Sequence, residues 1–129
     1  MASRTTESPA IILFAHGARD PEWAEPFRQI QRTLQAKRPR LTVELAFLDV
    51  MEPSLPDAIS ALVNEGHRSI TIAPIFMAQG GHLKNDLPKI LDAIRAEHKE
   101  THIRLLPPIG EVEPVLNAIS DWLLGVSAS

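Results

Sequence analysis

Four short apolar runs, rich in β-branched residues, alternate along the chain with longer segments whose apolar positions recur every three or four residues. A short apolar run is typical of a buried strand, and the three-to-four spacing is typical of a helix with one face against a core. The pattern therefore predicts a parallel sheet with crossover helices. The predicted strands cover residues 10–15, 42–48, 69–76 and 102–106.

Residues that favour helix ends punctuate the four helical segments. Asp20-Pro21 is a cap followed by a first-turn proline for the first helix, and Ser54 is the N-cap of the second helix, which Gly66 ends. Asp86 is the expected cap of the third helix, and the fourth follows Gly110. The predicted inward faces carry Trp23, Phe27, Ile30 and Leu34; Leu55, Ile59, Leu62 and Val63; Leu87, Ile90, Leu91 and Ile94; and Val112, Val115, Leu116, Ile119 and Leu123.

Four strand-helix units with right-handed crossovers give an α/β fold: a single doubly wound domain with a four-stranded parallel sheet of order 2-1-3-4 and helices on both faces. We expect this domain to cover residues 10–125, with a disordered tail at 1–9 and a frayed tail at 126–129. In such a sheet the strand order reverses between the first and third strands. A ligand is expected outside the carboxyl ends of those two strands.

Composition narrows the possible functions. The chain has 129 residues, no cysteine and a formal charge of −3. The absence of cysteine excludes thiolate metal sites and cysteine nucleophiles, and the interspersed charges offer no basic surface for nucleic acid. No apolar run is long enough for a membrane span, so we expect a cytoplasmic protein. Walker, dinucleotide-binding and serine-elbow motifs are absent.

Two histidines follow the strands at the expected ligand edge. His16 comes directly after the first strand, before Gly17, and His82 follows the third strand. A histidine after a strand is usually a hydrogen-bonded turn residue, but two that converge at a switch point suit binding of one metal ion. Neutral imidazole is a ligand for cobalt, nickel, iron and zinc, and two ligands leave coordination positions open.

Asp49 ends the second strand and is a candidate third ligand or proton acceptor; its alternative role is capping a turn. Three other histidines lie away from the expected cleft. We expect His67, His98 and His102 to have solvated or capping roles.

Loops beside the expected cleft carry candidates for substrate contact. Arg19 and Lys84 are cations suited to an anionic ligand, although such residues are usually just solvated. Met77 is a candidate apolar wall for a flat macrocycle. Gly80 and Gly81 either form a tight turn or let backbone approach the ligand closely.

The order and spacing of these residues resemble the small sirohydrochlorin chelatases, which are short class II chelatases. The resemblance covers nearly the whole chain between the two tails. It is carried by FAHGAR at 14–19, FLD at 47–49 with EPS at 52–54, and PIF at 74–76 with GGHLKNDLP at 80–88.

The resemblance implies a lyase that inserts cobalt, iron or nickel into sirohydrochlorin without ATP, in cobalamin or siroheme biosynthesis, with no permanently bound cofactor and the metal ion as substrate. It implies a homodimer, and it implies that His16 and His82 bind the metal and assist deprotonation. Some members have a catalytic Glu where this chain has Asp49, whose reach is about one methylene shorter.

Two other functions use the same residues. A non-catalytic carrier of metal or tetrapyrrole would bind through His16 and His82 without turnover. A histidine phosphatase would use His16 as nucleophile, but the Arg expected immediately before such a histidine is Ala15 here.

Overall fold

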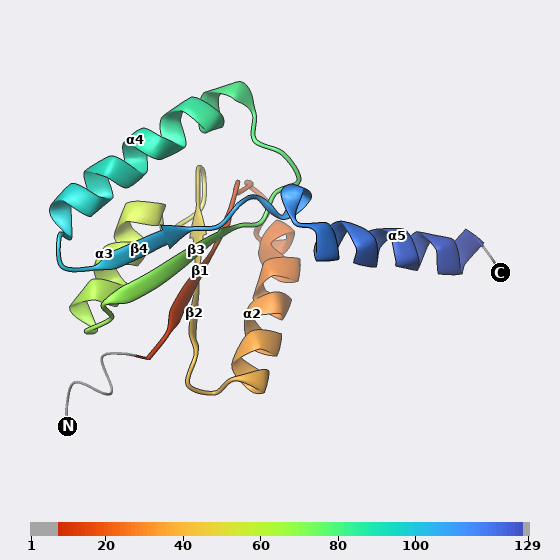
Figure 1. The fold of residues 1–129 in the computed structure, drawn as a ribbon, viewed down its shortest axis with the longest axis horizontal. Helices are drawn as coiled ribbons and strands as arrows, with labels where there is room; N and C mark the ends of the chain where they lie inside the picture. Colours follow the sequence, from red (N-terminus) through yellow and green to blue (C-terminus); the bar gives the residue numbers. More distant parts are fainter. Residues whose placement is uncertain (1–7, 128–129) are drawn as a thin grey trace.

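A computed structural model describes residues 8–127 of the chain, and it contains one four-stranded parallel sheet (Figure 1). The order β2-β1-β3-β4 confirms the predicted topology. The strands are β1 (Ala10–Ala15), β2 (Thr42–Phe47), β3 (Ser69–Pro74) and β4 (His102–Leu105).

Three strands end one or two residues earlier than predicted, because their neighbours turn away. The last ladder hydrogen bonds beside β1 run from the Leu48 amide to the Ala15 carbonyl at 2.9 Å and from the Ile75 amide to the Phe14 carbonyl at 2.8 Å. Beyond them β1 bends at Gly17, which has φ +95°. With no straight neighbour, β2 and β3 cannot extend further as strands.

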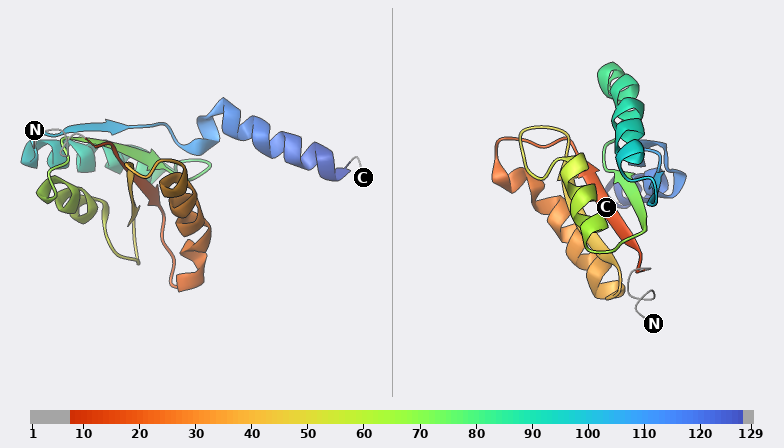
Figure 2. Two further views of the ribbon diagram at one scale, coloured as in Figure 1. Left: turned by 90° about the horizontal axis from the view of Figure 1, so that it is seen from below. Right: turned by 90° about the vertical axis from the view of Figure 1, so that its left-hand side faces the viewer.

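Helices pack on both faces of the sheet, as predicted (Figure 2). One face carries α3 (Leu55–Asn64) and α4 (Gly81–Glu97), and the other carries the 3₁₀ turn η1 (Pro21–Ala24) and α2 (Glu25–Lys37). Alternation along β1 divides the core, because Ile12 and Phe14 pack under α3 and α4 whereas Ala15 packs under η1. The α2 face is less completely covered: α2 has no buried residue, and Ile30 on its predicted inward face is exposed.

Two predicted side-chain caps are formed, one at the 3₁₀ turn η1 and one at α3, whereas α2 itself begins only at Glu25 and has no side-chain cap. Asp20 accepts a hydrogen bond from the Glu22 amide at 2.9 Å, and Ser54 accepts one from the Asp57 amide at 3.3 Å. α3 ends just before Gly66, whose φ of +99° suits the left-handed conformation after a helix.

The predicted start of the third helix at Asp86 is wrong. α4 begins at Gly81, with Gly80 as its N-cap, and contains Pro88 in its interior. Leu83, Leu87 and Leu91 are all buried at i, i+4 spacing, so the helix buries one continuous apolar face. That burial outweighs the lost hydrogen bond at Pro88, and it places His82 in the first turn of the helix rather than in a loop.

The last helix, α5 (Glu113–Ser127), behaves differently from the other helices. It follows the 3₁₀ turn η2 (Ile109–Glu111), packs mainly against that turn, and extends away from the sheet (Figures 1 and 2). Leu116, Ile119 and Leu123 of its predicted inward face are exposed, and so is Trp122. None of the helices in residues 8–127 has the length and apolarity that a membrane crossing requires.

The two predicted tails lie mostly outside the described residues, which omit 1–7 and 128–129. α5 runs on to Ser127. The division of the chain into tails and domain stays a prediction.

Candidate functional site

His16 is the first residue after β1, between the loops that follow β2 and β3. Its side chain is exposed, and its ring lies 4.7 Å from the ring of Phe76, centroid to centroid, at 43°. Phe76 is buried and itself makes an edge contact with Phe14. The core therefore holds one face of the imidazole. No hydrogen bond occupies the ring nitrogens of His16 within the described part of the chain.

The loop after β2 is attached to the His16 turn by backbone contacts. The Asp49 amide donates to the His16 carbonyl at 3.0 Å. A Cβ built on Gly17 would lie 2.0 Å from the Asp49 carbonyl oxygen, and Gly17 has a positive φ. Only glycine fits there, for both reasons. The close approach at Gly17 is therefore to the chain's own backbone.

Asp49 has a structural partner in its own loop. Its Oδ1 accepts a hydrogen bond from the Val50 amide at 2.9 Å, which is the turn-capping role considered from the sequence. The side chain is exposed, so its role as proton acceptor or ligand stays a prediction. Glu44 of β2 has a different neighbourhood. Partial burial and then the charge of Glu65 raise the pKa of Glu44, and the charge of His67 opposes this rise. These neighbours place Glu44 toward the edge of the sheet opposite His16.

The loop after β3 is supported by η2. A Cβ on Gly110 would lie 1.5 Å from the Met77 carbonyl oxygen, so η2 packs directly on the Met77 backbone. The Met77 side chain points outward enough to be 54% exposed. From the sequence, Gly110 is expected only to precede a helix. Its packing role depends on a contact 33 positions away along the chain, which no local pattern reveals.

The start of α4 supplies the remaining predicted residues on this side. An added Cβ at Gly80 or Gly81 would meet no atom within 4 Å, so neither glycine is required by packing in the described structure. His82 is the second residue of α4, but its side chain lies outside what the structure describes. Its convergence with His16 on one ion stays a prediction.

Arg19 and Lys84 are exposed, and their contact with a substrate stays a prediction. Among the described side chains, no three or more His, Asp or Glu gather into a metal site.

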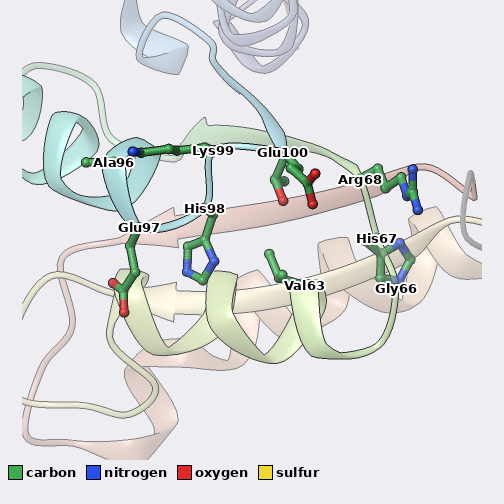
Figure 3. Close-up of a pocket in the computed structure, with 10 residues that line it drawn as sticks. Val63, Gly66, His67, Arg68, Ala96, Glu97, His98, Lys99 and Glu100 are labelled. Atoms are coloured by element: carbon green, nitrogen blue, oxygen red, sulfur yellow. The ribbon is translucent and has the colours of Figure 1, made fainter.

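A hollow of about 580 Å³ lies at the opposite edge of the sheet, where α3 leads into β3 and α4 into β4 (Figure 3). Its two histidines are used by the fold. His98 pairs with Ser60 (Nε2 to Oγ, 3.3 Å), and His67 Nδ1 donates to the Ser8 carbonyl at 3.1 Å. The capping role predicted for His98 fits, since His98 is the C-cap of α4. Of the two roles expected for His67, solvated or capping, the solvated one is wrong, because this side chain is only 8% exposed.

Comparison with known proteins gives a consistent result. The sequence model of the CbiX family matches residues 10–124. A sirohydrochlorin cobaltochelatase from Saccharolobus islandicus (strain L.S.2.15) is 31% identical over 111 residues, covering 81% of this chain and 85% of that protein. One from Methanococcus aeolicus is 34% identical over 88 residues, which are 68% of this chain but only 62% of that protein's length.

Two solved structures share the fold. A CbiX protein from Marinobacter aquaeolei VT8 superposes with a TM-score of 0.77 at 32% identity, over 94% of this chain and 99% of that one. The sirohydrochlorin chelatase SirB from Bacillus subtilis subspecies spizizenii, in complex with cobalt, has a TM-score of 0.74 at 23% identity. The match covers 92% of this chain and 51% of SirB. At that identity the likeness to SirB concerns the fold alone. The family match and the Saccharolobus and Marinobacter relatives show that this chain belongs to the CbiX family.

Proposed function

We propose that this protein is a class II chelatase that inserts cobalt, iron or nickel into sirohydrochlorin without ATP, in cobalamin or siroheme biosynthesis. The observation that carries the proposal is His16: an exposed imidazole, held on one face by Phe76, at the carboxyl edge of the sheet where the strand order reverses between β1 and β3. Relatives named as sirohydrochlorin cobaltochelatases add support.

Metal insertion requires that the ion loses water and that two pyrrole N–H protons leave the macrocycle. In our proposal, neutral His16 and His82 replace part of the ion's water and hold it beneath the ring. They then accept protons as the ring nitrogens take over the ion. Asp49, whose amide donates to the His16 carbonyl, carries the carboxylate that we propose receives those protons.

The macrocycle is proposed to lie over this edge of the sheet. Its apolar surface would contact Met77, and its carboxylates would pair with Arg19 and Lys84. The open space around Gly80 and Gly81 leaves room for the ring to approach the first turn of α4. Replacing either glycine by alanine costs the fold little and is expected to weaken macrocycle binding.

We further propose that the working form is a homodimer in which α5 lies at the interface. Trp122 is 67% exposed and Leu123 is 53% exposed, on a helix that packs mainly against η2. Across the sheet from α3 and α4, Thr71 and Ala73 of β3 are also only half-buried. A second copy would cover both apolar surfaces. Trp122→Glu should convert the dimer to a monomer in analytical ultracentrifugation. Glu113→Gln, a second substitution on α5, is the control and should leave the dimer intact.

The decisive experiment mixes the full chain with metal-free sirohydrochlorin and Co²⁺, Fe²⁺ or Ni²⁺ without ATP and follows the visible spectrum. His16→Ala and His82→Ala should each slow enzyme-dependent metallation about a hundredfold. His98→Ala removes an imidazole at the other edge of the sheet and should leave the rate unchanged.

Two results would contradict the proposal. Metallation no faster than in buffer, despite binding of the macrocycle, would instead support the carrier function. Equal rates for wild type and both cleft variants would remove the two histidines from the mechanism.

A further inference from the structure

Val50 combines two properties that the fold does not explain. Its φ is +70°, in the left-handed region that a β-branched side chain rarely adopts, and the side chain is 61% exposed. Because the Val50 side chain is exposed, packing contributes little free energy to offset this strain. Asn or Gly would adopt the same backbone conformation at lower cost. A strained residue without a packing reward indicates a role outside folding.

The backbone contacts of the β2 loop fix Val50 relative to His16. The Leu48 amide bonds to the Ala15 carbonyl, and the Asp49 amide bonds to the His16 carbonyl. Asp49 then holds the Val50 amide through Oδ1 at 2.9 Å, and its carbonyl accepts from the Met51 amide at 2.7 Å. Val50 is therefore held one residue beyond a direct contact with the His16 backbone.

Exposed apolar side chains stand on both sides of His16. Leu48, which is also exposed, and Val50 follow β2, and Met77 follows β3, while His16 follows the strand between them. Apart from Ile30 on α2, the other large exposed apolar side chains of the described residues belong to α5. The His16 edge is thus one of two places in residues 8–127 where large apolar groups lie together in solvent.

We infer that Val50, with Leu48, is an apolar wall that contacts the macrocycle on the β2 side of His16, opposite Met77. This inference rests on the proposed function and adds a substrate-positioning residue that neither the sequence pattern nor the resemblance indicates. A flat ring bearing charged groups at its periphery needs apolar contacts near its centre and polar ones at its rim. Val50 and Leu48 supply the apolar contacts on the side that Met77 does not reach.

Two substitutions at Val50 separate contact from conformation. Val50→Thr keeps the size and the β-branch, so the backbone strain is unchanged, but places a hydroxyl against the ring. Val50→Asn relieves the strain, because Asn tolerates the left-handed region. Ile30→Thr is the matched control, since Ile30 is an exposed β-branched residue on α2, away from this edge.

We expect Val50→Thr to raise both the Kd for metal-free sirohydrochlorin and the KM about fivefold, with kcat within twofold and the melting temperature unchanged. Val50→Asn should raise Kd and KM similarly while raising the melting temperature. Ile30→Thr should change none of these. Unchanged Kd in both Val50 variants would overturn the inference, and so would parallel losses of kcat and thermal stability.

The binding titration separates this inference from the proposed activity. If wild type binds and metallates the macrocycle but Val50 has no effect, the inference alone fails. If binding depends on Val50 but no metallation occurs, the contact stands and the chelatase activity fails. If wild type does not bind the macrocycle, both are wrong.

Discussion

The two edges of the sheet both carry histidines, but the chain treats them in opposite ways. At the carboxyl edge His16 is exposed, and Phe76 supports its ring without occupying its nitrogens. At the amino edge the rings of His67 and His98 pair with the Ser8 carbonyl and with Ser60. A hollow is present at the amino edge, yet its imidazoles already serve the fold.

This difference shows what to examine when several histidines compete for a functional assignment. The presence of a hollow does not show which edge of the sheet holds the reactive site. The better guides are histidine ring nitrogens that are not hydrogen-bonded within the fold and exposed apolar side chains nearby. By both criteria we assign the candidate site to the carboxyl edge, whereas the imidazoles of the amino edge bond within the fold.

The largest expected effect comes from the glycine that attaches the β2 loop at the carboxyl edge. Gly17→Ala places a Cβ against the Asp49 carbonyl at a positive φ, so the loop must move. We expect a loss of about 2–4 kcal/mol in the free energy of unfolding, measured by urea denaturation, and loss of metallation. Gly80→Ala, which meets no atom, is the control and should cost less than about 1 kcal/mol. Equal stability for the two variants would refute the attachment.

A smaller effect is expected at the amino edge. His67→Ala removes a buried ring and its hydrogen bond to the Ser8 carbonyl, which should lower the free energy of unfolding by about 1–3 kcal/mol. The rate of metallation per folded molecule should be unchanged. His102→Ala removes an exposed histidine at the start of β4 and should stay within about 0.5 kcal/mol of wild type. A specific loss of turnover in His67→Ala would give the amino edge a role in the reaction.

The smallest effect should depend on pH. Burial and the charge of Glu65 raise the pKa of Glu44 above its ordinary value of 4.5, so the folded state binds this proton more tightly than the unfolded chain does. Stability from this group is therefore present below pH 4.5 and lost as pH rises through the raised pKa. Glu44→Gln should stabilise the protein at pH 7 by less than about 1 kcal/mol, because solvent screens this partly exposed group.

That gain should disappear near pH 4, as measured by thermal melting across pH. Glu113→Gln, at an exposed position on α5, provides the comparison. A stabilisation of Glu44→Gln that persists unchanged at low pH would show that the charge of Glu44 is not its cause.

The sheet order and most elements follow from the sequence because they depend on local patterns: alternating runs, the caps at Asp20 and Ser54, and the stop at Gly66. The start of α4 does not follow from the sequence, because Asp86 and Pro88 are local signals for a later start. The earlier turn is stabilised only when Leu83 and Leu87 pack on the sheet.

The outward course of α5 is equally invisible, since an apolar helical face looks the same whether its own core or another surface covers it.

The site divides in the same way. His16 follows a strand directly, so its place at the carboxyl edge is predictable from the strand alone. The supports around it are not: Gly17 against Asp49 and Gly110 against Met77 are contacts between distant segments, and the exposed Val50 depends on a loop conformation that no pattern encodes.

The contact between Gly110 and the Met77 backbone links the two apolar surfaces of the molecule. η2 touches the Met77 backbone at one end and leads through Val112 directly into α5 at the other. The projecting helix is therefore joined through η2 to the backbone beside the candidate site. If a second copy orients α5, as we propose, the same contact would let assembly influence the position of Met77 beside His16.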